Sequence, residues 1–386
     1  MITKVGHSTN KDSDKQGIEC VTKSKISDKS KLGLVFTSCN NDHSKIVEGI
    51  RSKTQIPVIG MTSSDNLLVP GAILETKKNG YCAMMNFESE ELIVGVGSSK
   101  RGTDPRESGR KAAKEALKSS GLMKVPNYFY MVASPGEENE YLLGIQDIIG
   151  RVKFFGGSAA DDKNTGNWKI ICNDAVITNG VAVAFFYTND EMITSLSHDY
   201  KETSNVGVIT KISKTKELIE INNTEPLQIY LNWTNKNIKD LDKKDFINEI
   251  ILNPIGIKTE NNGIVNFTYP LNTSDKNNVL FGNNVDLNTA IVQFTSTTEN
   301  LINSFGKSLR YTNRAMYEKP SGYIIMHSTA RKIPFDTKLK EVHKILEEKT
   351  KGKPYIVAFT YGEYGYNEHS ANQCTNLSLS FTGFSE

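Results

Sequence analysis

The sequence predicts a mixed α/β (α+β) fold with two α/β domains, residues 1–224 and 225–386. Three observations support this prediction. The chain has 386 residues, which is longer than one typical domain. Short runs rich in β-branched and aromatic residues alternate with stretches of helical periodicity. The first domain also contains an internal repeat of strand, helix, strand and hairpin.

The first domain contains seven predicted strands. Each is short, apolar and bounded by turn residues. They cover Leu32–Ser38, Pro57–Ser63, Tyr81–Phe87, Leu92–Ser99, Tyr128–Ser134, Lys153–Ser158 and Gly180–Tyr187.

Three helices are predicted between these strands, at residues 42–54, 104–121 and 138–150. Asp42 and Asp104 stand where N-cap residues are expected. Pro105 and Gly121 then mark the start and the end of the second helix, in the order that helices prefer.

The internal repeat is visible in short matching segments. VFTS (35–38) recurs as MVAS (131–134), 96 residues later. At the same spacing Gly60 matches Gly156 and Asp65 matches Asp161. Each half also carries an Asn-Gly pair before its last strand, at residues 79–80 and 179–180. Since Asn-Gly favours two-residue turns, a hairpin is expected at each pair.

The second half of the chain begins with a predicted hairpin of residues 208–212 and 218–221. Pro226 is expected near the first turn of the helix that follows. Further strands (290–294, 322–327 and 355–359) and helices (297–316 and 337–351) are predicted beyond it.

Composition excludes several classes of protein. The net charge is +2 and the basic residues are scattered, so no nucleic-acid partner is expected. No apolar run of about 18 residues is present, so no membrane span is expected.

The five cysteines form no CxxC pair, and the six histidines form no HxxxH or HExxH pair. We therefore expect a reduced, cytoplasmic protein without a metal site. Dinucleotide and P-loop motifs are absent as well, so no cofactor is expected.

The first candidate for a binding site is the stretch FFGGSAADD (154–162). Gly156 and Gly157 would allow close approach of a ligand to backbone N–H groups, Ser158 could donate, and Asp161 or Asp162 could accept from an ammonium group. Together these groups suit an amino acid. The alternative is a tight turn in which Asp161 bonds to its own backbone.

The second candidate is YGEYGYNEH (361–369) after a predicted strand. Glu363 could pair with a ligand cation, Tyr361 could stack on it, and His369 could act as a base or donor. Arg331 follows another predicted strand and could hold a carboxylate with two hydrogen bonds. A surface turn and a structural salt bridge are the respective alternatives.

GGSAADD, the strands that follow it and the junction VITKISKTKELIEINNTEP (208–226) resemble the FIST N-terminal domain. The tail TYGEYG…NEHSANQCTNLSLSF is similar to the end of the FIST C-terminal domain. The resemblance implies an intracellular sensory protein that binds a small molecule, with an amino acid as one possibility. It implies no catalytic activity, and its output is expected in a separate signalling protein.

Two segments depart from the family pattern. MTSSDN (61–66) stands where a small-residue run ending in an acid is usual, and Ser328 stands where a cysteine often precedes the arginine. Two other functions stay open. One is a hydrolase assembled from Ser158, His369 and Glu363, although no GxSxG motif is present. The other is an interaction scaffold without a ligand.

Overall fold

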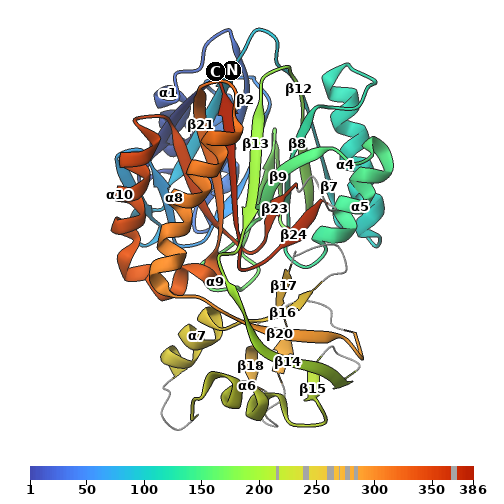
Figure 1. The fold of residues 1–386 in the computed structure, drawn as a ribbon. Helices are drawn as coiled ribbons and strands as arrows, with labels where there is room; N and C mark the ends of the chain where they lie inside the picture. The colour runs from blue at the N-terminus through green and yellow to red at the C-terminus, as the bar shows by residue number, and fades with distance from the viewer. Residues whose placement is uncertain are drawn as a thin grey trace.

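The computed structural model of the protein describes residues 1–213, 217–237, 243–258, 265–268, 270–273, 279–281, 286–366 and 372–386. These residues form a larger and a smaller body (Figure 1). The chain leaves the larger body after residue 197, builds the smaller one, and returns before residue 298. Both termini lie at the end of the larger body that is far from the smaller one.

The larger body consists of three repeats with one order of elements: strand, helix, strand, helix, strand, hairpin and strand. Two of them are the halves of the repeat that the sequence predicts, and the third is formed by the C-terminal part of the chain. The first repeat comprises β1 (Ile2–Ser8), α1 (Ser13–Lys23), β2 (Ser30–Ser38), α2 (His43–Arg51), β3 (Val58–Ser63), the hairpin β4 (Asn66–Val69) and β5 (Ala72–Glu75), the short helix α3 (Thr76–Asn79) and β6 (Cys82–Glu88).

The second repeat follows directly. It comprises β7 (Ile93–Lys100), α4 (Pro105–Ser120), β8 (Tyr128–Ala133), α5 (Glu138–Ile149), β9 (Lys153–Ser158), the hairpin β10 (Ile170–Cys172) and β11 (Ala175–Ile177), and β12 (Gly180–Tyr187).

The third repeat is interrupted by the smaller body, which is inserted after its first strand. It comprises β13 (Met192–Ser197), α8 (Thr298–Ala315), β21 (Pro320–Ser328), the short helices α9 (Thr329–Lys332) and η2 (Ile333–Lys338), α10 (Leu339–Thr350), β22 (Tyr355–Thr360), the hairpin β23 (Glu363–Gly365) and β24 (Gln373–Thr375), and β25 (Leu379–Ser385).

Each repeat forms a sheet with the same pairing. In the first, β1 and β6 are antiparallel, β6 and β2 are antiparallel, and β2 and β3 are parallel. The second repeat has β7, β12, β8 and β9 in the same order, and the third has β13, β25, β21 and β22.

The hairpins join the three sheets into a closed ring. The hairpin of the first repeat extends the sheet of the third, because β4 pairs with β22. That of the second extends the sheet of the first through β10 and β3, and that of the third extends the sheet of the second through β23 and β9. Every repeat therefore depends on another one to complete its sheet.

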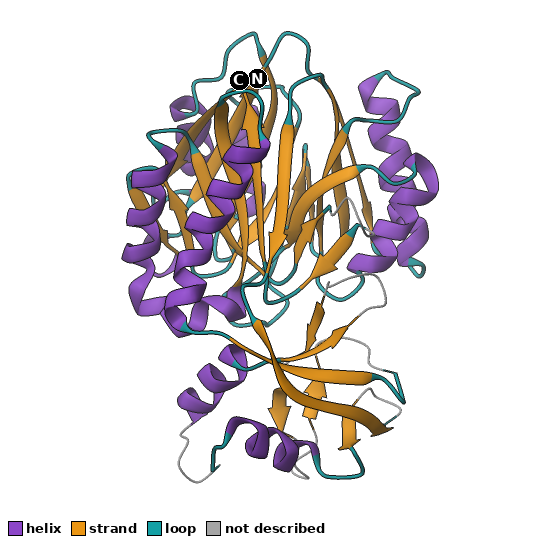
Figure 2. Cartoon of the chain, in the orientation of Figure 1, coloured by secondary structure: helices purple, strands orange, loops and turns teal. Residues whose placement is uncertain are grey.

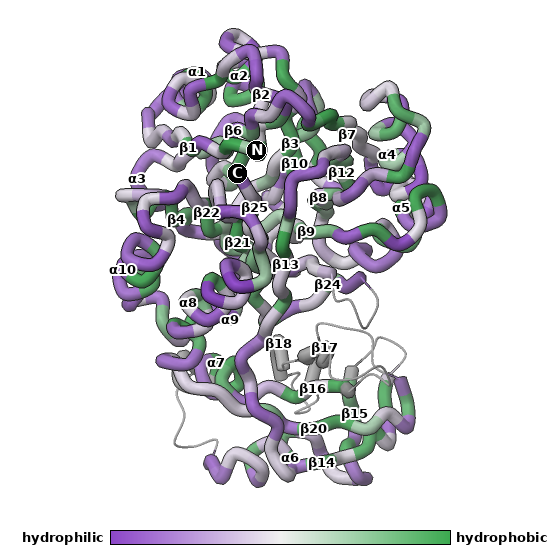
Figure 3. Tube along the Cα trace, turned by 45° about the horizontal axis from the view of Figure 1, so that its top comes forward, coloured by the Kyte–Doolittle hydropathy of each residue, from purple (hydrophilic) through white to green (hydrophobic). Residues whose placement is uncertain are grey.

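The ring encloses a shared hydrophobic core. Since side chains alternate along a strand, Phe36 points into this core and its neighbour Val35 packs under α1 and α2. Val132 and Met326 occupy the shared core in the second and third repeats. Helices cover the outer face of each sheet (Figure 2), and along α10 hydrophilic and hydrophobic residues alternate (Figure 3), as expected when one side of a helix faces a sheet.

The smaller body has its own sheet and core. Its core includes Ile209, Tyr230 and Ile291. Its elements are β14 (Lys201–Ile212), β15 (Glu217–Ile221), α6 (Pro226–Thr234), α7 (Lys243–Leu252), β16 (Ile255–Lys258), β17 (Val265–Thr268), β18 (Pro270–Thr273), β19 (Val279–Phe281) and β20 (Ala290–Thr295). No helix in the described part of the chain is long and apolar enough to cross a membrane.

The predicted mixed α/β class and the internal repeat are confirmed. So are the caps of α4: the Asp104 carboxylate accepts from two backbone N–H groups, and Gly121 ends the helix with φ of 70°. The division into domains at residues 224 and 225 stays a prediction, and this point lies between β15 and α6.

The predicted Asn-Gly hairpins are wrong. The hairpins are β4–β5 and β10–β11, and both end before the Asn-Gly pair. The two glycines of these pairs have different roles. Gly80, with φ of 72°, is the C-cap of α3. A Cβ on Gly180 would lie 2.2 Å from the Ser99 carbonyl oxygen, so this glycine allows close strand packing.

Candidate functional site

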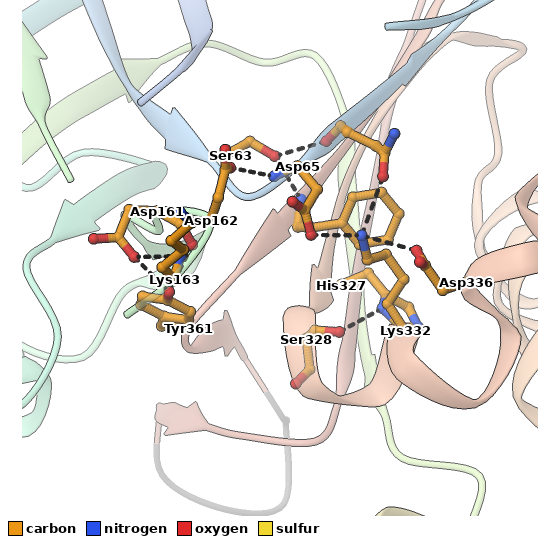
Figure 4. Close-up of polar contacts among 12 residues, drawn as sticks. Ser63, Asp65, Asp161, Asp162, Lys163, His327, Ser328, Lys332, Asp336 and Tyr361 are labelled. Carbon is orange, nitrogen blue, oxygen red and sulfur yellow. Dashed lines mark hydrogen bonds and ion pairs between the residues drawn. The ribbon is translucent and has the colours of Figure 1, made fainter. Parts of the chain in front are cut away.

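The candidate site lies where β3, β9 and β22 end (Figure 4). This is the side of the larger body that faces the smaller one (Figure 1). Polar residues follow each of these strands within three residues of its end. They lie side by side because the hairpins bring the strand ends of different repeats together.

Gly156 and Gly157 allow strands to approach closely. A Cβ on Gly156 would lie 1.9 Å from the Met131 carbonyl oxygen, and one on Gly157 would lie 2.9 Å from that of Gly362. Both distances are shorter than any side chain allows. Gly60 of the first repeat has the same role, since a Cβ there would lie 1.9 Å from the Val35 carbonyl oxygen.

Ser158 is fully buried at the end of β9. Its hydroxyl donates to Glu138 Oε1 at 2.8 Å and lies 2.7 Å from the Tyr364 hydroxyl. Burial raises the pKa of Glu138, although hydrogen bonds from Ser158 and from backbone N–H groups oppose this rise. Ser158 therefore belongs to a chain of buried polar groups.

Asp161 holds the loop that follows β9. Its carboxylate accepts from the backbone N–H groups of Lys163, Thr165 and Asn167, the last at 2.7 Å, and from the Tyr361 hydroxyl at 2.8 Å. Burial opposes ionisation, but these hydrogen bonds outweigh it and lower the pKa of Asp161. The carboxylate thus bonds to the backbone of its own loop and to Tyr361 of the third repeat.

Asp162 connects the loops of two repeats. Its Oδ1 accepts from the Asp65 backbone N–H at 2.7 Å. The Asp65 carboxylate in turn lies 3.1 Å from Lys332 Nζ, and Lys332 also donates to Asn66 and pairs with Asp336. Lys332 is only 3% exposed, so this cation depends on its partners.

Arg331 is the largest fully buried side chain of the described part. None of its three guanidinium nitrogens makes a hydrogen bond of good geometry with a described residue, although the Tyr200 side chain lies close enough to favour the charged form. The Asp199 carboxylate lies 3.6 Å from Nη2, beyond the range of a good hydrogen bond. Burial lowers the pKa of Arg331, while Tyr200, Asp199 and Glu363 act in the opposite direction. Arg331 is therefore a buried cation whose N–H groups could bind a further acceptor.

Glu363 is a fully buried carboxyl group on β23. It accepts from the Thr360 hydroxyl at 2.8 Å and from the hydroxyl and backbone N–H of Ser378 at 2.9 and 3.2 Å. Burial raises the pKa of Glu363 to about 8, against these hydrogen bonds and the charge of Arg331. Its neutral and ionised forms are therefore both accessible near neutral pH.

His327 is a buried residue of this region that sequence reasoning did not select. Its Nδ1 lies 2.9 Å from the Ser328 carbonyl oxygen, and its ring stacks on Phe305 with 5.0 Å between the ring centroids. Burial, and then the charge of Arg331, lowers the pKa of His327. Its Nε2 has no hydrogen-bond partner among the residues described.

The predicted residues fall into two groups. Asp161, Asp162 and Tyr361 form a network of loops, whereas Glu363 pairs with Gly157 in the sheet and is electrostatically coupled to Arg331. His369 lies outside the described residues. Within the described ranges no cluster of three or more His, Cys, Asp or Glu could hold a metal ion.

Lys332 and Asp199 are further charged residues of this region that the sequence did not reveal. Lys332 directly follows the selected Arg331, so a search of that short helix could have found it. No sequence pattern singled out Asp199, because its position depends on the junction between the two bodies.

Comparison with known proteins identifies a family for the first half of the chain. The family model of the FIST N domain matches residues 31–224. No curated protein matches the sequence.

Two solved structures show distant similarity. Cyanuric acid hydrolase from A. caulinodans has 7% sequence identity and a TM-score of 0.35, with 100% of this chain and 99% of that chain covered. PurLQS from Thermotoga maritima has 8% identity and a TM-score of 0.23, with 99% of this chain and 72% of that chain covered.

Proposed function

Because the chain belongs to the FIST family, we propose that it is a sensory protein that binds a small polar metabolite, with an amino acid as the first candidate. Residues 225–386 would complete it as a FIST C-terminal-like domain, and the signal would pass to a separate output protein. We place it in the cytoplasm, which the five free thiols support.

The pair Arg331 and Glu363 carries this proposal. Both side chains are fully buried, they influence each other electrostatically, and no ion pair joins them among the described contacts. A buried guanidinium without a well-placed acceptor costs free energy that a ligand carboxylate can recover. A carboxyl group with a pKa near neutrality can accept an ammonium group in its ionised form.

An amino acid offers both groups. Its carboxylate could take two parallel hydrogen bonds from Arg331, which the planar guanidinium favours. Its ammonium group would favour the ionised form of Glu363. Under this proposal Asp161, Asp162 and Tyr361 position the surrounding loops, and Gly156, Gly157 and Ser158 support the sheet beneath them.

The test is a thermal-shift and calorimetry screen of the full chain against amino acids, organic acids, amines and nucleotides. A ligand at 100 times its dissociation constant should stabilise the protein by about 2.7 kcal/mol. Glu363→Gln should weaken binding of an amino acid more than binding of an acid without an amine. The proposal fails if no class of compound raises the melting temperature.

The hydrolase alternative depends on Ser158. Its neighbouring polar groups are Glu138 and Tyr364, and Glu363 instead accepts from Thr360 and Ser378. This alternative stays a prediction. It would be favoured if the protein cleaved simple esters or amides and Ser158→Ala removed that activity.

A further inference from the structure

Asp199 stands where the chain crosses from the larger body to the smaller one. The two crossings are residues 198–200, between β13 and β14, and residues 296–297, between β20 and α8 (Figure 1). The backbone of Asp199 has φ of 57°, a left-handed conformation that residues other than glycine adopt at a cost. A conformation of this kind persists only where the surrounding contacts hold it.

The contacts of Asp199 tie both crossings to the larger body. Its backbone carbonyl accepts from the Ser296 hydroxyl at 2.9 Å, which links the first crossing to the second. Its Oδ1 lies 3.0 Å from Lys307 Nζ on α8, and its Oδ2 lies 3.6 Å from Arg331 Nη2 on α9. One residue therefore contacts the junction, the outer helix and the buried guanidinium.

Asp199 is an incomplete counter-ion for Arg331. Its carboxylate is shared with Lys307, which is closer, and the distance of 3.6 Å is too long for a good hydrogen bond to the guanidinium. A ligand carboxylate could approach Arg331 more closely and with two oxygens. Once a ligand neutralises the charge of Arg331, the attraction that holds Asp199 towards α9 weakens.

We propose that Arg331 binds the carboxylate group of a small organic acid or amino acid in competition with Asp199, and that Asp199 transmits ligand occupancy to the smaller body. This inference rests on the proposed function and names the ligand class and the regulation of the same site. In the empty protein Asp199 is held between Lys307 and Arg331. In the occupied protein it keeps Lys307 but loses the attraction of Arg331, and the two crossings relax together through Ser296.

The ligand class is tested on the full chain with two mixtures, one of common α-amino acids and one of the matching α-carboxamides, and with inorganic phosphate. The carboxylates should raise the melting temperature, and the carboxamides should not. Equal shifts with both mixtures would contradict the role of Arg331 and leave the proposed function intact. If phosphate alone raised the melting temperature, the ligand of Arg331 would be another oxyanion and not a carboxylate. No shift with any probe or metabolite would contradict the proposed function itself.

The role of Asp199 is tested with Asp199→Asn, which keeps the size of the side chain and tolerates the left-handed backbone. Without the competing charge, affinity for the carboxylate mixture should rise, on the order of tenfold. Asp174→Asn removes the same charge from an exposed side chain in the turn between β10 and β11 and should leave the affinity unchanged. An unchanged or weaker affinity of Asp199→Asn would contradict the competition.

Hydrogen exchange reports on transmission. In the wild-type protein the carboxylate mixture should speed amide exchange at residues 198–201 and 294–297. In Asp199→Asn the mixture should still bind but leave this exchange unchanged. Ser296→Ala, which removes the link between the crossings, should restrict the response to the first crossing. If the ligand-induced change persists in Asp199→Asn, Asp199 does not transmit occupancy.

Discussion

The Tyr361 hydroxyl lies 2.6 Å from the Asp161 backbone carbonyl oxygen and 2.8 Å from Oδ1 of the same residue. It also accepts from the Asn164 backbone N–H at 2.9 Å. Tyr361 follows β22 of the third repeat and Asp161 follows β9 of the second. Tyr361 therefore links the loop after β9 of the second repeat to the end of β22 in the third.

Tyr361→Phe should destabilise the protein by about 1–2 kcal/mol, because it removes a hydroxyl whose partners are part-buried. The free energy of unfolding in urea measures the effect. Tyr317 is 98% exposed, so Tyr317→Phe serves as the matched control and should change the free energy by less than about 0.5 kcal/mol. Equal effects of the two variants would show that the loop does not depend on Tyr361.

Lys332 makes a second prediction about contacts between repeats. Asp65→Asn should cost about 2 kcal/mol, because the buried ammonium group loses its charged partner in the first repeat. Asparagine tolerates the positive φ of 51° at this position, so the change tests the charge. Asp336 is 57% exposed at its side chain, so Asp336→Asn should cost much less. If Asp336→Asn were the more destabilising variant, Asp336 and not Asp65 would be the main partner of Lys332.

Glycines of the strands and of the helix caps should respond differently to alanine. Gly60→Ala places a Cβ 1.9 Å from the Val35 carbonyl oxygen, so we expect a loss of more than about 3 kcal/mol or failure to fold. Gly121→Ala meets no atom within 4 Å but requires the left-handed backbone, so it should cost only about 1 kcal/mol. Urea unfolding of both variants checks this order, which would be wrong if Gly121→Ala were the more damaging change.

Much of the fold could be predicted from local sequence. Strands and helices of the first two repeats follow from periodicity and from caps such as Asp104 and Gly121. The matching glycines revealed the repeat, since Gly60 and Gly156 allow the same close approach of strands.

The third repeat could not be predicted in the same way. The smaller body separates β13 from α8, so the repeat is not contiguous. In its strand register Val357 pairs with Ile325 as Gly60 pairs with Val35, so the glycine that marks the other two repeats is absent. The exchange of hairpins also depends on contacts between distant segments, which periodicity does not encode.

The candidate site was accessible to sequence reasoning only in part. Polar residues at strand ends drew attention to Asp161, Glu363 and Arg331. The chemical difference between them arises from packing: Asp161 is surrounded by backbone donors, whereas Arg331 is buried without a well-placed acceptor among the described residues. Such a difference depends on burial and distance, which the order of residues does not contain.

The raised pKa of Glu363 predicts a specific pH dependence of stability. A carboxyl group whose pKa in the folded state is about 8 binds its proton more tightly there than in the unfolded state, where its pKa is roughly 4.3. Its contribution to stability is therefore complete below the unfolded pKa and is lost as pH rises towards 8, with a maximum slope of about 1.4 kcal/mol per pH unit.

Glu363→Gln should remove this dependence, because glutamine resembles the protonated carboxyl group and does not titrate. The free energy of unfolding of the variant, measured relative to the wild-type protein, should improve steadily from about pH 5 to about pH 8. Glu341→Gln makes the same change at a side chain that is 56% exposed and controls for the altered net charge. A constant difference between Glu363→Gln and the wild-type protein across this range would mean that Glu363 is already ionised at pH 5, and that Arg331 has a charged partner before any ligand binds.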